Sequence, residues 1–185
     1  MAKQAYTITV CSAHWASNNK GIDVTSYVTK LVDNPGSNGE LVFTPSNSFF
    51  GNQDPDPGNT KYCGVVVEMT VGGTTTQYAV ACQEGSTLQL LPDGFLALVK
   101  QPSCGILPGK AQVFGGIYAC QFGGLDVSAG VQAHMNCGGL GIWVDPRAFA
   151  YDPFVGTPKY LFVGYGTDPN NQTFKAGIDG QTLTF

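Results

Sequence analysis

The stretch Gly58-Asn59-Thr60-Lys61-Tyr62 runs directly into the apolar segment Cys63-Gly64-Val65-Val66-Val67, and the same order recurs as Gly156-Thr157-Pro158-Lys159-Tyr160 before Leu161-Phe162-Val163. A Pro/Asp/Gly-rich loop followed by a short β-branched or aromatic run is typical of a strand entered from a turn. The pattern Gly-x-x-Lys-Tyr occurring twice indicates an internal repeat.

Three further blocks fall in the same order on either side of this one. Residues 22–28 match residues 125–131, each with an aspartate followed by valine and a hydroxyl residue. Phe50 matches Phe149, and residues 84–90 match residues 179–185 across an acidic residue and glycine. The initial strands are placed with Cys11 opposite Cys120. Differences in spacing are those expected from loop insertions.

We therefore predict an all-β fold of two tandem, pseudo-twofold-related β-sandwich modules, with copy 1 at 5–92, a linker at 93–114 and copy 2 at 115–185. Strands are expected at 6–11, 40–44 and 62–69, with counterparts at 116–121, 140–144 and 160–165. Short helical turns are expected at 25–32 and 128–135, and Gly72-Gly73 is expected to close a hairpin. Asp23 and Asp126 are expected to form an N-cap or Asx-turn before each helical turn.

Composition limits the function. Only 12% of residues are charged, the net charge is −4, and 25 residues are glycine. No Lys/Arg cluster exists, which disfavours nucleic acid and anionic membrane surfaces as partners. The chain carries no signal-peptide pattern and no apolar run long enough for a membrane span, which indicates a leaderless protein or a mature secreted form. The six cysteines are expected to be reduced, buried thiols.

The first copy resembles a β module that occurs, often in tandem, in bacterial and fungal proteins, and it looks like the C-terminal domain of a family of J-domain chaperones. The residues that carry this resemblance include Ile22-Asp23-Val24-Thr25, Gly39-Glu40-Leu41-Val42-Phe43, Phe50-Gly51, Asp54-Pro55-Asp56-Pro57-Gly58, Lys61 and Glu84-Gly85. The resemblance covers nearly all of 6–92 and, more faintly, 115–185. It implies the fold but no activity, and no J-domain is present.

Motifs for catalysis and cofactors are absent from the sequence. His14 and His134 are the two histidines; with Cys11 and Cys137 they could complete a zinc site, although nothing in the repeat brings them together. The loop around Asp54 and Asp56 could bind calcium but lacks the EF-hand spacing, and a turn built by Asp, Pro and Gly is the preferred interpretation. We expect no enzyme activity, no cofactor and no metal; a small hydrolase stays a second alternative.

Aromatic side chains beside Asn and Asp suit sugar rings, so the leading hypothesis is lectin-like recognition of a carbohydrate or cell-surface ligand. The ligand-binding candidates are Trp15, Asn18, Asn19, Asp54, Asp56, Tyr151 and Asp152. Trp15 is expected to be partly exposed in a polar loop, Ser12–Gly21, whereas core packing is expected more for Trp143. The first alternative is a membrane-active toxin that inserts the hairpin at 70–78. A membrane is expected as a partner only under this alternative. The oligomeric state is left open.

Overall fold

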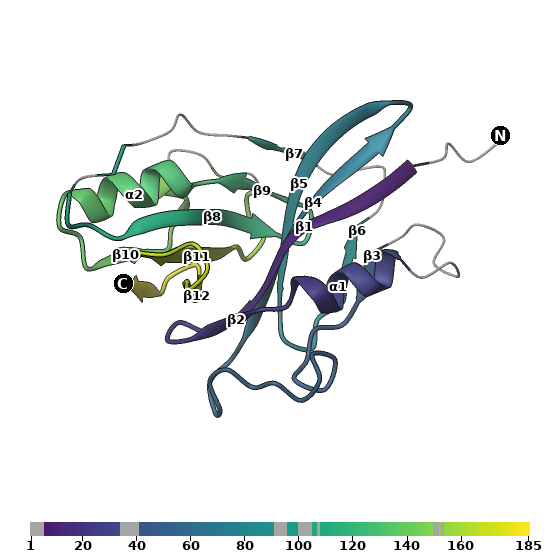
Figure 1. Cartoon of the computed structure of the whole chain (residues 1–185), viewed down its shortest axis with the longest axis horizontal. Coiled ribbons are helices and arrows are strands. Elements are labelled where there is room, and N and C mark those ends of the chain that lie inside the picture. Colours follow the sequence, from purple (N-terminus) through teal and green to yellow (C-terminus); the bar gives the residue numbers. More distant parts are fainter. Residues whose placement is uncertain are drawn as a thin grey trace.

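A computed structural model describes residues 6–33, 41–90, 96–99, 105–106, 108–149, 152 and 154–185. These residues are mostly in strands, with two short α-helices and one 3₁₀ helix, so the all-β class is confirmed. Figure 1 shows two sheet-containing halves packed side by side. We call the part before residue 91 the first half and the part from residue 112 onward the second half.

The elements of the first half follow the order strand, strand, helix, strand, long loop, three strands. They are β1 (Tyr6–Ala16), β2 (Gly21–Asp23), α1 (Thr25–Val32), β3 (Leu41–Phe43), β4 (Tyr62–Val71), β5 (Thr74–Gln83) and β6 (Leu88–Leu90).

The second half repeats that order. Its elements are β8 (Gln112–Cys120), β9 (Gly123–Asp126), α2 (Ser128–Asn136), β10 (Gly141–Trp143), η1 (Pro146–Phe149), β11 (Tyr160–Gly166), β12 (Thr173–Ile178) and β13 (Thr182–Thr184). Between the halves, β7 (Leu96–Val99) pairs in parallel with β9. The segment predicted as a linker thus also contributes a strand to the second sheet.

Strand pairing is the same in both halves. The first sheet has the order β2-β1-β4-β5, and the second contains β9-β8-β11-β12 with β7 added beyond β9. A two-stranded sheet completes each half, β3 with β6 and β10 with β13. Because shared connectivity and shared pairing coincide, positions can be matched between the halves.

Equivalent hydrogen bonds fix this matching. Asp23 Oδ1 accepts the Thr25 N–H at 2.7 Å, and Asp126 Oδ1 accepts the Ser128 N–H at 3.0 Å. These are the predicted Asx-turns, each placed just before its helix. The hydroxyls of Thr25 and Ser128 in turn accept backbone N–H groups of the first strand, those of Ala13 and Gly116.

The loops match in the same way. The Gly85 N–H donates to Pro45 O at 3.0 Å, and the Gly180 N–H donates to Val144 O at 2.9 Å. In the first half, Trp15 pairs with Ile22, and the neighbouring pair is His14 with Asp23. In the second half, Tyr118 pairs with Leu125, and the neighbouring pair is Ile117 with Asp126. Trp15 and Tyr118 are therefore equivalent, and Cys120 corresponds to Ser17. The predicted match of Cys11 with Cys120 is wrong, because this strand register makes Cys120 equivalent to Ser17, six residues after Cys11.

Each half has its own buried core. Alternate residues of each strand point into it, because successive side chains of a strand face opposite sides of the sheet. Trp15 and Phe50 pack together in the first core, with ring centroids 5.2 Å apart, and Tyr118 and Phe149 pack in the second at 4.8 Å. A third cluster joins the halves. It contains Ala16, Tyr62, Ala79, Ala81, Ile117, Ala119, Tyr160, Phe162 and Ala176.

The interface between the halves relies on small residues. Tyr62 and Tyr160, equivalent first residues of β4 and β11, contact each other at 5.1 Å between centroids. A Cβ added to Gly64 would lie 2.8 Å from the Phe162 ring, so this glycine lets the ring approach the first sheet.

The other local predictions have mixed outcomes. The two helical turns and the Gly72-Gly73 hairpin are confirmed, with both glycines at positive φ (57° and 84°) as a type I′ turn requires. Cys63, Cys82 and Cys120 are buried thiols, and burial raises the pKa of Cys82 to about 12. Cys11 and Cys137 are exposed, so the expectation that they are buried is wrong, and Cys104 lies outside the described residues.

Candidate functional site

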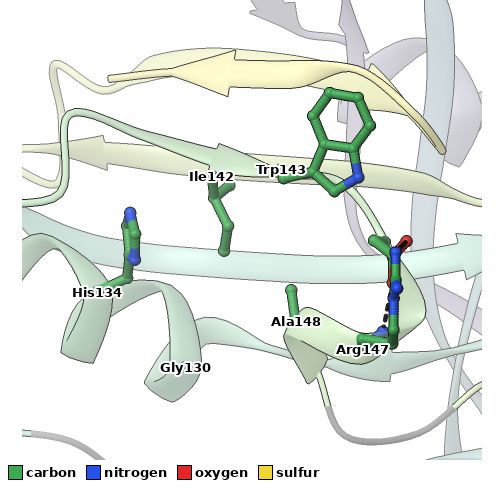
Figure 2. A pocket seen from close by; sticks show the side chains of 7 residues that line it. Gly130, His134, Ile142, Trp143, Arg147 and Ala148 are labelled. Carbon is green, nitrogen blue, oxygen red and sulfur yellow. Dashed lines mark hydrogen bonds and ion pairs between the residues drawn. The ribbon is translucent and has the colours of Figure 1, made fainter.

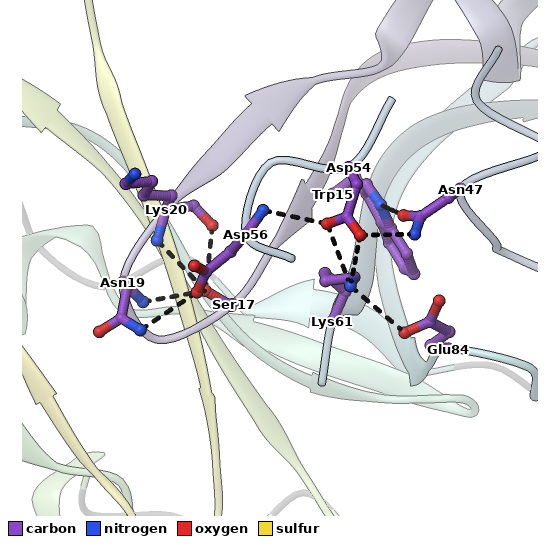
Figure 3. A network of polar contacts seen from close by, with 9 residues as sticks. All are labelled: Trp15, Ser17, Asn19, Lys20, Asn47, Asp54, Asp56, Lys61 and Glu84. Atoms are coloured by element: carbon purple, nitrogen blue, oxygen red, sulfur yellow. Dashed lines mark hydrogen bonds and ion pairs between the residues drawn. The ribbon is translucent and has the colours of Figure 1, made fainter. Parts of the chain in front are cut away.

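The predicted site residue Asp54 lies in a network around Lys61 (Figure 3), which we call the Lys61 cluster and define as Asn47, Asp54, Lys61 and Glu84. Lys61 Nζ lies 3.1 Å from Asp54 Oδ1 and 3.9 Å from Glu84 Oε2, and its side chain is 5% exposed. The amide of Asn47 donates to Asp54 at 2.9 Å and accepts the indole N–H of Trp15 at 3.1 Å. The network thus ties the long loop to the core.

Asp56 is held by a neighbouring set of donors. The Ser17 hydroxyl lies 2.5 Å from Asp56 Oδ2, and the Asn19 amide donates to the same oxygen at 3.1 Å. These hydrogen bonds hold the pKa of Asp56 below its ordinary value, and the bond from Ser17 contributes more than the bond from Asn19. Burial tends to raise the pKa of Asp54, but hydrogen bonds from Lys61, the Asp56 N–H and Asn47, together with the charge of Lys61, outweigh burial and the pKa is lowered. Both carboxylates are thus committed to internal partners.

The second half contains the counterpart of this cluster. Lys159 Nζ lies 3.2 Å from Asp152 Oδ1 and 3.5 Å from Asp179 Oδ2, and its side chain is 4% exposed. It also donates to the backbone oxygens of Phe154 and Thr157. Asp152, a predicted ligand-binding residue, therefore has the same structural role as Asp54. Tyr151 lies outside the described residues.

Trp15 is not where the sequence placed it. It lies in β1 and is fully buried against Phe50, so the expectation of an exposed Trp15 is wrong. The loop between β1 and β2 covers only residues 17–20, against two residues, 121–122, between β8 and β9. Asn18 and Asn19 lie in that short turn, with Asn18 half-buried and Asn19 exposed.

A groove of about 470 Å³ lies in the second half, between α2, β10 and η1 (Figure 2). We call it the Trp143 groove. Its lining residues are Gly130, His134, Ile142, Trp143, Asp145, Arg147 and Ala148. The indole of Trp143 is 53% exposed, which reverses the expectation that Trp143 is the more buried of the two tryptophans.

The equivalent place in the first half is filled by that half's own side chains. From the matched hydrogen bonds, Gly130 corresponds to Tyr27 and Ala148 corresponds to Phe49. Both larger residues pack against the first core, and Phe49 stacks on Phe43 with centroids 5.0 Å apart. Replacing two aromatic rings by glycine and alanine leaves open volume, because neighbouring side chains fill such space only in part.

Three other positions change from the first half to the second in ways that suit a ligand. Trp143 stands where the first half has Thr44, so the shared fold does not require an aromatic residue there. His134 stands in place of Leu31, which packs against the first core. Arg147 stands in place of Ser48. The groove therefore has a large aromatic face, an imidazole and a guanidinium that its counterpart lacks.

The polar end of the groove is a bidentate ion pair. Arg147 Nε and Nη2 each donate to Asp145 at 2.8 Å, and the Arg147 side chain is 86% exposed. Hydrogen bonding from Arg147, with a smaller contribution from the Trp143 indole, lowers the pKa of Asp145 to about 2. The pair fixes the guanidinium while leaving it further N–H donors that face away from Asp145.

His134 is oriented by the backbone. Its Nε2 lies 2.7 Å from the carbonyl oxygen of Gly141. Because a carbonyl can only accept, Nε2 carries the proton, and in the neutral ring Nδ1 is left as an acceptor. The groove is thus lined by an imidazole from α2 and a guanidinium from η1, together with the apolar side chains of Ile142 and Ala148.

Other chemistry finds little support in the part of the chain that the structure describes. Within it, no group of three or more His, Cys, Asp or Glu side chains could hold a metal ion. His14 lies in β1 and stacks on Phe174, with centroids 4.3 Å apart. Neither described helix is long and apolar enough to cross a membrane.

Comparison of the chain with family models, curated proteins and solved structures found no match. The site therefore rests on the geometry. Sequence reasoning did not place Asp145, Arg147 and His134 together at a groove. A position-by-position comparison of the two halves would have pointed to this place, because it sets Tyr27 against Gly130 and Phe49 against Ala148.

Proposed function

We propose that the chain is a non-enzymatic binding protein that recognises carbohydrate through the Trp143 groove. The observation that carries this proposal is the difference between the halves: the place that Tyr27 and Phe49 fill in one half is open in the other. Loss of core packing costs stability. The groove costs stability and is bordered by an exposed indole, and binding of a ligand best explains why it is kept.

Sugar is the ligand class that the chemistry favours. A pyranose ring has an apolar C–H face, which suits the exposed indole of Trp143, and hydroxyls at its rim, which need both donors and acceptors. Arg147 supplies donors, while Asp145 and His134 Nδ1 supply acceptors. The groove volume of about 470 Å³ lies within the range of small-molecule sites.

We further infer that the two halves are tandem copies of one β-sandwich module, with boundaries near 5–92 and 115–185. The shared element order, the matched Asx-turns and the two buried lysines support this inference. In this account the first copy keeps the filled, structural form of the site and the second copy carries the binding form.

The test is a glycan array probed with the wild-type protein and three variants. Ala148→Phe restores the ring that the first half has at this place, and Trp143→Ala removes the aromatic face. Thr44→Ala, at the position equivalent to Trp143, is the matched control. We expect wild type and Thr44→Ala to bind the same glycans and the other two variants to lose them. Absence of wild-type binding, or vesicle leakage in its place, would contradict the proposal.

A further inference from the structure

The β4–β5 hairpin is longer than its counterpart. Strands β4 and β5 have 10 residues each, against 7 in β11 and 6 in β12. Figure 1 shows the far ends of β1, β4 and β5 projecting away from the second half. The extra length lies beyond the contact between the halves, which involves Ala79 and Ala81 of β5.

Along this extension, one side of β5 has no partner strand in the part of the chain that the structure describes. Among the described residues β5 hydrogen-bonds as a strand only with β4, whereas β7, β8 and β9 pack against β5 without pairing with it. We call residues Thr74–Tyr78 the β5 edge. Val71 and Thr74 flank the two-residue turn, so their backbone groups bond to each other and point inward. By alternation, the N–H and C=O groups of Thr75 and Gln77 point outward.

In the second half, the edge strand β12 is bonded to the first half at the position equivalent to Ala81. The outward N–H of Ala176 in β12 donates to Ser17 O at 2.7 Å, and Lys175 lies beside it on the same strand. Proteins also protect free edges with charges or proline. The sequence of the β5 edge, Thr74-Thr75-Thr76-Gln77-Tyr78, contains no Lys, Arg, Asp, Glu or Pro. Its nearest acid, Glu68, already accepts the Gln77 amide at 2.9 Å.

We propose that the β5 edge pairs in antiparallel fashion with the β5 edge of a second copy of this chain. A twofold axis at Thr76 places Thr75 opposite Gln77 of the second copy, so the outward N–H and C=O groups of both residues bond in both directions. No like charges meet across this junction, although each chain has a net charge of −4. The two four-stranded sheets then form one continuous sheet.

The test measures mass in solution by light scattering across a concentration series. We expect wild type to approach twice 19.5 kDa as concentration rises. Thr75→Pro removes an outward donor that a lone chain does not use, and proline is tolerated at a strand edge. We expect this variant to weaken dimerisation roughly tenfold or more, because it loses hydrogen bonds to the second copy and its proline ring meets the facing strand. Thr75→Val keeps the N–H and is the matched control, which should dimerise as wild type does.

Amide hydrogen exchange of the wild-type protein gives an answer that does not depend on the folding of any variant. The Thr75 and Gln77 amides should become protected as the protein is concentrated. A mass of 19.5 kDa at all concentrations would overturn the proposal. So would a dimer in which both amides exchange freely, or one that Thr75→Pro leaves unchanged while its fold is retained. Pairing of this edge with a different protein and not with itself would overturn it as well.

Discussion

Lys61 and Lys159 are equivalent buried cations, each directly preceding the strand that begins with a tyrosine. Lys61 lies 3.1 Å from Asp54 and 3.9 Å from Glu84, and Lys159 lies 3.2 Å from Asp152 and 3.5 Å from Asp179. One carboxylate of each pair comes from the loop before the lysine, and the other comes from the turn that follows β5 or β12. Each lysine therefore joins two loops of its half to the sheet.

Removal of either ammonium should destabilise the protein. Lys61→Met or Lys159→Met leaves two carboxylates close together with no cation, and we expect a loss of about 2–4 kcal/mol in the free energy of unfolding. Urea denaturation measures it. Lys110→Met, at an exposed lysine, is the control and should change the free energy by less than about 0.5 kcal/mol. Equal, small effects at all three positions would show that the buried pairs do not stabilise the fold.

The two tryptophans should respond oppositely to truncation. Trp15 is fully buried, so Trp15→Ala should cost about 3–5 kcal/mol of stability through lost packing. Trp143 is 53% exposed, so Trp143→Ala should stay within about 1 kcal/mol of wild type. Thermal and urea unfolding distinguish the two. A stable Trp15→Ala protein would contradict the assignment of Trp15 to the core.

His14 should make stability depend on pH. Burial lowers its pKa to about 4, and the charge of Asp23 opposes this only in part. In the unfolded chain the pKa of His14 is near 6.5, so between pH 6.5 and 4 the unfolded chain binds more protons than the folded chain. Stability is therefore fully present above pH 6.5 and falls as the pH drops toward 4, by at most about 3 kcal/mol because the ring keeps some exposure.

The variant His14→Phe isolates this contribution, since it keeps a ring against Phe174 without a titrating group. Between pH 6.5 and 4 its unfolding free energy should fall less than that of wild type. His134 and all carboxylates are common to both proteins, so the difference between the two curves reports His14. Parallel curves would mean that His14 keeps an ordinary pKa.

Chelation should have no effect on folding. The oxygens of Asp54 and Asp56 are occupied by Lys61, Asn47, Ser17 and Asn19, which leaves little need for a cation there. We expect EDTA to leave the melting temperature unchanged. A drop of several degrees that calcium or zinc reverses would show that the loop holds a metal.

Local signals in the sequence predicted the all-β class and the shared order of elements, because strand runs, turn glycines and the aspartates before each helix act over a few residues. The same approach failed for Trp15. Residues 12–21 look polar as a block, yet Ala13 and Trp15 alternate with polar neighbours and face the core, as a period of two requires. Reading the alternation would have placed Trp15 inside.

The Trp143 groove was harder to foresee. Gly130 lies on α2 and Ala148 on η1, and each small residue is unremarkable in its own segment. Only when both elements are placed against β10 do their missing side chains leave one common space. A groove of this kind depends on which side chains are absent at several separated positions, and a pattern within one short stretch of sequence does not show that.

The central claim is that the Trp143 groove binds sugar, and the indole N–H resonances of the two tryptophans test it most directly. The ¹⁵N-labelled protein would be titrated with glucose, galactose, mannose, N-acetylglucosamine, fucose and sialic acid, each to millimolar concentration. We predict that at least one sugar shifts the Trp143 signal in a saturable way, leaves the Trp15 signal in place, and has no effect on Ala148→Phe. No saturable shift at Trp143 with any of the six, or an equal shift in the Ala148→Phe protein, would contradict it.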